Sequence, residues 1–545
     1  MWIRNLVFIL LCVGGLSALA GSLAPIRKSP ADKQLSAAVP DAELREAVAS
    51  VDRAFRDEWQ RHGLAPAHRA DDLTIARRLS LGLLGTVPSL EELRQLEGEP
   101  AETRLHRWLA RILADRRSHD YLAERLARAY VGVQDGPFII YRRRRFVAWL
   151  ADQLEANRPY NEIVQELIAD SGLWTDHPAT NFITATGKPD PKKPDQIKPD
   201  PVELTARVSR AFLGVRLDCA ECHDHPFEDW KQADFQGLAA FFGPTRQGLT
   251  GIHDGDAAYT VENRTTGDEE TVSPQVPFDR ALVATEGNPR RRLAAWVTHR
   301  ENRAFGRAIV NRIWAQLFGR PLVEPIDDLH SAETLPVAID LLADDFVKHG
   351  YDLRRLMQAI AQTEVFRLDS RSDADAAEQD GAELEDAWAV FPLTRLRPEQ
   401  AIGGVLQAGS LQTIDYQSHI LVRLARLGGQ NDFIKRYGDL GEDEFAAQGE
   451  TIPQRLLMMN GGQVHDRIKE NLVANAATQI AALAPNDARA VETAYLCVLT
   501  RRPTPDEARH FEGMLADTAD TRTRPQRMED LYWCLLNSTE FSWNH

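Results

Sequence analysis

The sequence has little cysteine, no excess of basic charge and few long apolar runs, and each shortage excludes a class of protein. Five cysteines among 545 residues cannot form a disulfide framework, so any function that they have depends on local spacing. Lysine and arginine number 64 against 80 for aspartate and glutamate, and a net charge of −16 argues against nucleic acid as a partner. A polytopic membrane fold is excluded as well. No P-loop, dinucleotide glycine pattern, G-x-S-x-G or H-E-x-x-H motif occurs, so the common nucleotide and hydrolase sites have no support.

The N-terminus holds an apolar run from Leu6 to Ala20 that ends in small residues suited to a signal peptidase. This pattern predicts a signal peptide over residues 1–20. An uncleaved anchor over residues 6–24 is the alternative, because about 20 apolar residues span a bilayer. We therefore expect an exported protein of the periplasm or cell envelope, either released or anchored to the inner membrane.

Apolar residues recur at helical spacing along most of the chain, whereas alternating runs of β-branched residues are scarce. The sequence therefore predicts a mainly α, multi-helical fold. Two helix starts carry a capping-box pattern, in which a hydroxyl and a carboxylate three residues apart satisfy free backbone amides. These pairs are Ser89 with Glu92 and Thr504 with Glu507.

The organisation along the chain is predicted from composition. Residues 41–243 and 289–545 read as two packed helical regions, and residues 244–288 read as a short irregular or β-containing connector rich in Gly, Thr and Asp. A hairpin is expected around residues 259–272 within this connector. Residues 187–201 hold too many prolines for a helix and predict an extended, solvated segment.

The pattern with the clearest chemistry is Cys219-Ala220-Glu221-Cys222-His223, the C-x-x-C-H attachment motif for haem c. Two thiols three residues apart on one helical turn can add to the two vinyl groups of one porphyrin. The histidine that follows then lies under the iron as its proximal ligand. Asp224 and His225 are expected to surround this ligand as hydrogen-bonding neighbours. Six aromatic residues that suit an apolar cofactor lie near the motif in sequence: Phe212, Phe227, Trp230, Phe235, Phe241 and Phe242.

Other interpretations of the same residues stay open. In an oxidising compartment Cys219 and Cys222 could form a local disulfide. They could also join His223 or His225 on a zinc ion, although no fourth ligand is evident nearby. As a third alternative, the two thiols have no function and the nearby aromatic residues are ordinary residues of the hydrophobic core. The distal iron ligand is undecided among four candidates, Met458, Met459, His177 and His253.

An acidic group at Glu324, Asp327 and Asp328 also attracts attention, because carboxylate oxygens bind calcium. Helix capping and ion pairs with Arg312 or Arg320 explain the same residues more simply. We therefore expect a structural role for this group.

Longer stretches of the sequence resemble a known family. Residues 212–242 (FLGVRLDCAECHDHPFEDWKQADFQGLAAFF) are similar to the core signature of a planctomycete-specific cytochrome-like domain. The C-terminal half resembles the planctomycete-specific partner domain of unknown function that follows it. The similar segments are 311–329 (NRIWAQLFGRPLVEPIDDL), 349–353 (HGYDL), 392–400 (PLTRLRPEQ), 453–460 (PQRLLMMN) and 536–541 (LNSTEF), with Asn544 and His545.

The resemblance implies a cytochrome-like domain but no particular reaction, so whether the protein is an enzyme stays undecided. Because the chain has one C-x-x-C-H motif, electron transfer would require a separate redox partner. We therefore predict an exported c-type haem protein with a redox or electron-transfer role. One alternative is a non-haem scaffold or binding protein of the cell envelope, with the motif as a disulfide or zinc clip. The other is a haem-dependent enzyme on an extracellular substrate.

Overall fold

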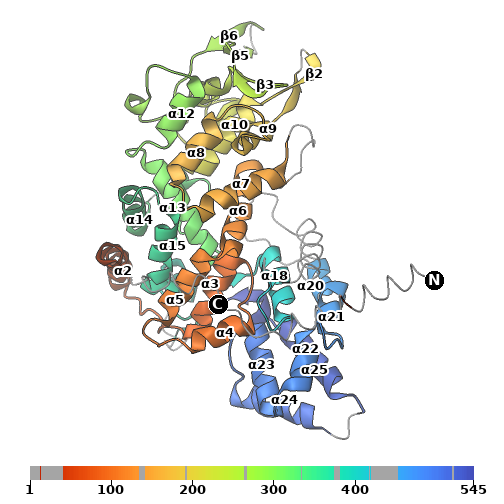
Figure 1. The fold of residues 1–545 in the computed structure, drawn as a ribbon. Helices are drawn as coiled ribbons and strands as arrows, with labels where there is room; N and C mark the ends of the chain where they lie inside the picture. The colour runs from red at the N-terminus through yellow and green to blue at the C-terminus, as the bar shows by residue number, and fades with distance from the viewer. Residues whose placement is uncertain are drawn as a thin grey trace, which may run out of the picture.

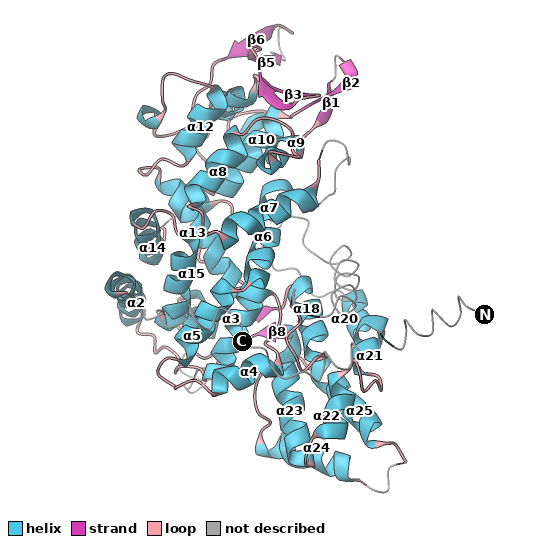
Figure 2. Cartoon of the chain, in the orientation of Figure 1, coloured by secondary structure: helices cyan, strands magenta, loops and turns pink. Residues whose placement is uncertain are grey.

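The computed structural model confirms a mainly helical, multi-helical protein with a few short strands (Figures 1 and 2). It describes Val13 and residues 41–133, 141–190, 193–262, 267–332, 334–372, 381–415, 418, 452–517 and 521–545. Apart from Val13, the predicted signal peptide and the alternative anchor lie outside the described residues. Among the helices of this described part, none is both long enough and apolar enough to cross a membrane.

From residue 41 onward, the described fold begins with seven helices. They are α2 (Ala42–His62), α3 (Asp72–Leu84), α4 (Leu90–Glu97), α5 (Arg104–Ala114), α6 (Arg116–Val131), α7 (Arg143–Glu155) and α8 (Tyr160–Ala169). Local sequence sets several of their ends. The Asp71 carboxylate accepts the amides of Leu73 and Thr74 at the start of α3. Helix α4 begins with the predicted capping box of Ser89 and Glu92.

The middle of the chain holds short helices and three separate two-stranded hairpins. The helical elements are η3 (Pro178–Thr180), α9 (Asn181–Thr184), α10 (Pro201–Val208), the π-helical turn η4 (Ser209–Leu213), η5 (Asp218–Glu221), α11 (Gln232–Ala239), η6 (Ala240–Phe242) and η7 (Arg280–Leu282). The antiparallel hairpins are β1 (Lys188–Asp190) with β2 (Lys193–Lys198), β3 (Thr245–Gly248) with β4 (Gly251–Asp254), and β5 (Tyr259–Glu262) with β6 (Glu269–Val272). The predicted hairpin at residues 259–272 is confirmed, with Tyr259 opposite Val272. The proline-rich segment is extended as predicted, but its two strands pair with each other.

The remaining elements are again mostly helical. They are α12 (Pro289–Val297), α13 (Arg303–Phe318), η8 (Leu329–Ser331), α14 (Val337–Lys348), α15 (Leu353–Gln362), α16 (Glu364–Arg367), α17 (Gly381–Asp386), α18 (Pro398–Ala408), α20 (Ile452–Asn460), α21 (Gly462–Ile468), α22 (Ala476–Leu483), α23 (Asp487–Leu499), α24 (Pro505–Ala516), α25 (Arg524–Leu536) and η9 (Glu540–Ser542). Strands β7 (Thr394–Arg395) and β8 (Trp543–Asn544) pair antiparallel. Helix α24 begins with the second predicted capping box, Thr504 with Glu507.

Two hydrophobic clusters hold the molecule together. The larger cluster draws on residues 44–391 and on Leu496, so it contains residues from both sides of the 244–288 segment. Its centre includes α13, where Ile313, Trp314 and Leu317 are fully buried. The smaller cluster joins residues 396–541 to Leu81 and Val87. In Figure 1 the hairpins β1 to β6 lie at one end of an elongated molecule and helices α22 to α25 lie at the other.

Candidate functional site

The C-x-x-C-H motif lies on an exposed loop that is anchored by buried neighbours. Cys219 lies within the single 3-10 turn η5, and Cys222 directly follows it. Residues three apart on a 3-10 helix eclipse each other, so the two cysteines share one side of the turn. The side chains of Cys219 and Cys222 are exposed, whereas Leu217 and Ala220 are fully buried. The loop therefore presents the two thiols to solvent from a fixed base.

The His223 ring is oriented by a hydrogen bond to the neighbouring backbone. His223 is exposed, and its Nδ1 lies 2.7 Å from the backbone carbonyl oxygen of Asp224. A carbonyl oxygen only accepts hydrogen bonds, so Nδ1 carries a proton, and in the neutral ring Nε2 keeps its lone pair. This is the tautomer that a histidine adopts when Nε2 binds a metal and Nδ1–H donates to a carbonyl.

His225 has the opposite proton arrangement. Its Nδ1 accepts the backbone amides of Phe227 at 3.3 Å and Glu228 at 3.0 Å, so the neutral ring carries its proton on Nε2. The His225 amide donates to the Trp230 carbonyl at 2.8 Å. These bonds make His225 the organiser of the turn after the motif, and its Nε2–H is unsuited to bind a metal.

Asp224 ties the motif to the next helix. Its carboxylate accepts the Gln232 amide at 3.0 Å and lies 3.4 Å from Lys231 Nζ at the start of α11. The hydrogen bond from Gln232, with smaller contributions from Lys231 and His223, holds the pKa of Asp224 below its usual value. The carbonyl and the carboxylate of one residue thus position both His223 and α11.

Ion pairs fix the base of the loop against the segment before η8. Arg210 Nε donates to Asp218 at 2.8 Å, and Arg216 pairs with Asp327 at 2.7 Å. Asp328 accepts the Arg216 amide at 3.4 Å. Burial, followed by the nearby Glu228, raises the pKa of Asp328. The two contacts of Arg216 join residues more than 100 positions apart in sequence.

The acidic group at residues 324–328 makes structural contacts, as expected. Glu324 pairs with Arg320 at 3.2 Å. Asp327 pairs with Arg216, and Arg312 donates to the Ala211 carbonyl at 2.7 Å. Arg312 lies in the interior of α13, where it satisfies a carbonyl in the middle of η4.

The aromatic residues near the motif divide into two groups. Five of the six pack in the larger hydrophobic cluster, at 0 to 9% exposure: Phe212, Trp230, Phe235, Phe241 and Phe242. Only Phe227 points outward, with 92% of its surface exposed. The Trp230 ring lies 4.7 Å from that of His330, an exposed imidazole that the sequence did not single out. Five of the six aromatic side chains thus belong to the hydrophobic core rather than to the exposed loop.

The other candidate ligands lie in separate surroundings. His177 pairs with Asp170 at 3.2 Å, and His253 belongs to strand β4. Met458 is buried in the smaller cluster, and the Met459 carbonyl accepts the indole N–H of Trp533. In the described part of the chain, no three side chains among His, Cys, Asp and Glu are placed to hold a metal ion.

The two C-terminal cysteines differ in environment. Cys497 is buried in α23 and Cys534 is exposed on α25. Burial raises the pKa of the Cys497 thiol to about 12. Such a thiol behaves as a small apolar side chain.

Fold and site together define a class: a mainly helical protein with an exposed C-x-x-C-H loop. The base of this loop is joined to a distant part of the chain by the pair of Arg216 with Asp327. Residues 50–247, which contain the loop, match the family PSCyt2, described as a protein of unknown function (DUF1549). Residues 289–420, which contain Asp327 and Asp328, match the family PSD1, also described as a protein of unknown function (DUF1553). The two matches occur in the order that the resemblance implied. No curated protein and no solved structure matches the chain.

Proposed function

We propose that this protein is an exported c-type haem protein with a redox or electron-transfer role. Cys219 and Cys222 would hold the haem covalently, and His223 would be the proximal iron ligand. The proposal is carried by the 2.7 Å hydrogen bond from His223 Nδ1 to the Asp224 carbonyl, which leaves Nε2 as a donor atom beside two exposed thiols.

The surroundings of the motif suit this role. When bound, haem would supply a one-electron redox couple. The chain's own residues would orient it: Asp224 fixes the His223 ring, and His225 shapes the turn. Because the loop is exposed, a haem edge held there would be open to a separate redox partner. Export, predicted from residues 1–20 or 6–24, accords with haem attachment outside the cytoplasm.

The test is a pyridine haemochrome assay on the full chain, expressed with its leader in a periplasm that contains haem-attachment machinery. We expect a covalent signal of about one haem per chain. The matched variant Cys219→Ala/Cys222→Ala is expected to lose this signal while circular dichroism shows the same helical content. A folded wild-type protein without covalent haem would overturn the proposal.

The same preparation separates the alternatives if haem is absent. Zinc at about one per chain, lost in the double variant, would favour a zinc clip. Two thiols that become titratable only after reduction would favour a local disulfide. If haem is present, the spin state decides between roles. A six-coordinate low-spin spectrum supports electron transfer, whereas a high-spin, ligand-binding iron supports an enzyme.

A further inference from the structure

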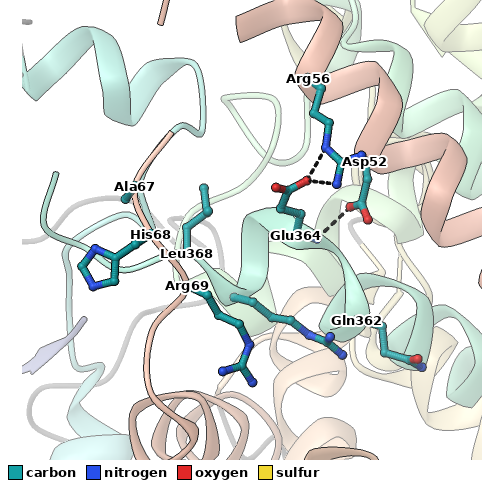
Figure 3. A pocket seen from close by; sticks show the side chains of 9 residues that line it. Asp52, Arg56, Ala67, His68, Arg69, Gln362, Glu364 and Leu368 are labelled. Atoms are coloured by element: carbon teal, nitrogen blue, oxygen red, sulfur yellow. Dashed lines mark hydrogen bonds and ion pairs between the residues drawn. The ribbon is translucent and has the colours of Figure 1, made fainter. Parts of the chain in front are cut away.

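A second candidate site lies far from the motif in sequence, where α2 meets the junction of α15 and α16. It is a pocket of about 470 Å³. Its lining residues are Asp52, Arg56, Ala67, His68, Arg69, Gln362, Glu364, Arg367 and Leu368, most of which Figure 3 labels. This volume falls in the range of small-molecule sites and exceeds what a single inorganic ion needs.

The backbone around the pocket is firmly paired. Arg69 and Leu368 form an antiparallel bridge. The Ala70 amide donates to the Arg367 carbonyl at 2.8 Å, and the Asp369 amide donates to the His68 carbonyl at 2.7 Å. These hydrogen bonds fix residues 67–70 against residues 367–369. The pocket that they line is therefore formed before any ligand binds.

Most charged groups of the lining already have a partner. Arg56 pairs with Glu364 at 2.6 Å, and Asp52 accepts the Glu364 amide at 2.7 Å, as Figure 3 shows. Arg69 pairs with Asp72 at 2.8 Å outside the pocket. His68 lies 3.7 Å from Asp369. Burial, and then the charge of Glu364, raises the pKa of Asp52.

Arg367 is the exception among these groups. Its guanidinium makes no hydrogen bond or ion pair with any residue that the structure describes, and its Nε is buried. Burial, followed by repulsion from Arg69, lowers the pKa of Arg367, although Asp52 and Asp72 act in the opposite direction. The side-chain amide of Gln362, which also lines the pocket, likewise has no partner among the described residues.

We propose that this pocket binds a small organic anion through the Arg367 guanidinium and the Gln362 amide. A guanidinium that lacks a partner in a preformed pocket matches a carboxylate, sulfate or phosphate group, to which it can donate two parallel hydrogen bonds. The remaining volume accommodates the body of the ligand. No residue that lines this pocket belongs to the C-x-x-C-H loop, so this proposal can be tested separately from the haem proposal.

Isothermal titration calorimetry on the full chain tests this site at constant ionic strength. The probes are D-glucuronate, inorganic sulfate, inorganic phosphate and, as the uncharged control, D-glucose. We expect at least one of the three anions to bind at a single saturable site with a dissociation constant of about 1 mM or lower. Glucuronate alone would assign a carboxylate ligand with a polar body, whereas equal binding of all three would assign recognition of the anionic group itself.

Variants locate the binding. Arg367→Gln is expected to weaken it at least tenfold. The control Arg489→Gln removes an exposed arginine on α23 that pairs with Glu492, and it should leave binding unchanged. Arg367→Lys keeps the positive charge but loses the paired N–H donors of the guanidinium, so it should weaken binding severalfold. This variant replaces Arg367→Gln in the test if the glutamine variant does not fold. Absence of saturable anion binding, or equal binding by folded wild type and Arg367 variants, would overturn the proposal.

Discussion

Arg125 and Glu399 form a buried ion pair at 3.0 Å, although 274 positions separate them in sequence. Their side chains are 2% and 7% exposed. Arg125 lies on α6, which packs in the larger hydrophobic cluster, and Glu399 lies at the start of α18, which belongs to the smaller one. The pair is thus a polar link between the two clusters.

Removal of one charge from this link should destabilise the protein strongly. Glu399→Gln removes the buried carboxylate with which Arg125 and Arg397 both pair, and breaking a buried ion pair costs about 3–5 kcal/mol. We expect a lower denaturation midpoint by circular dichroism. The control is Glu46→Gln, which breaks an exposed pair with Arg53 at 2.9 Å and should change stability by less than about 1 kcal/mol. Equal effects of the two variants would contradict the role of Arg125 and Glu399.

Gly214 sets the approach to the C-x-x-C-H loop, and its replacement should be costly. Its φ is 61°, and an added Cβ would lie 2.7 Å from Leu329 Cδ1. Gly214→Ala therefore combines backbone strain with a clash and should cost about 2–3 kcal/mol in a thermal or denaturant melt.

A matched glycine separates strain from clash at this position. Gly63 lies in the same left-handed region, with φ 64° and ψ 25°, but an added Cβ there meets nothing within 4 Å. Gly63→Ala should cost only the strain, about 1 kcal/mol. The double variant Gly214→Ala/Leu329→Ala should lose less free energy of unfolding than the sum of the losses in the two single variants, because Leu329→Ala removes the side chain that the added Cβ meets. A loss equal to that sum would show that the added Cβ does not clash with Leu329.

His223 and His225 should respond differently to substitution in protein that carries haem. His223→Ala removes the proposed proximal ligand, so the Soret band and spin state should change while covalent haem stays attached through the cysteines. His225→Ala removes a turn contact to Phe227 and Glu228 and should leave the axial ligation intact. Optical and electron paramagnetic resonance spectra of both variants measure this difference, and identical spectra would refute the assignment of His223.

Short-range sequence patterns predicted local structure well, because the interacting groups are neighbours in the chain. The capping boxes at Ser89 and Thr504 and the ion pair of Arg320 with Glu324 are of this kind. Contacts across the fold were beyond such reasoning. Nothing local in the sequence indicates that Asp327 pairs with Arg216, because their proximity results from packing α13 against η4.

The same limit applies to the candidate site. The spacing of Cys219, Cys222 and His223 was readable from the sequence, but the proton positions on His223 and His225 depend on backbone carbonyls and amides that only the folded loop positions. The aromatic residues near the motif also depend on the fold. Sequence proximity does not say which of them are exposed, whereas the structure buries five of the six in the larger cluster and leaves Phe227 exposed.

Acid stability should depend on the ion pairs of Arg501. Arg501 donates to Glu507 at 2.8 and 2.9 Å and also pairs with Glu540. Its hydrogen bonds lower the pKa of Glu507 from 4.5 to about 2. A carboxyl with a lower pKa in the folded state stabilises the fold above its unfolded pKa, and this stabilisation is lost as the pH falls from about 4.5 to about 2. We therefore expect the unfolding temperature of the wild type to drop over this range.

Glu507→Gln keeps a side chain that can complete the capping box with Thr504 but cannot titrate, so it isolates the charge. Its unfolding temperature should be below that of the wild type at pH 6, and the difference should shrink as the pH approaches 2. Glu512→Gln, on the same helix but outside the ion pairs of Arg501, is the control and should follow the wild type at every pH. Calorimetric scans between pH 2 and pH 7 measure these shifts. A constant difference between wild type and Glu507→Gln across this range would show that the Arg501 pair does not set the acid response.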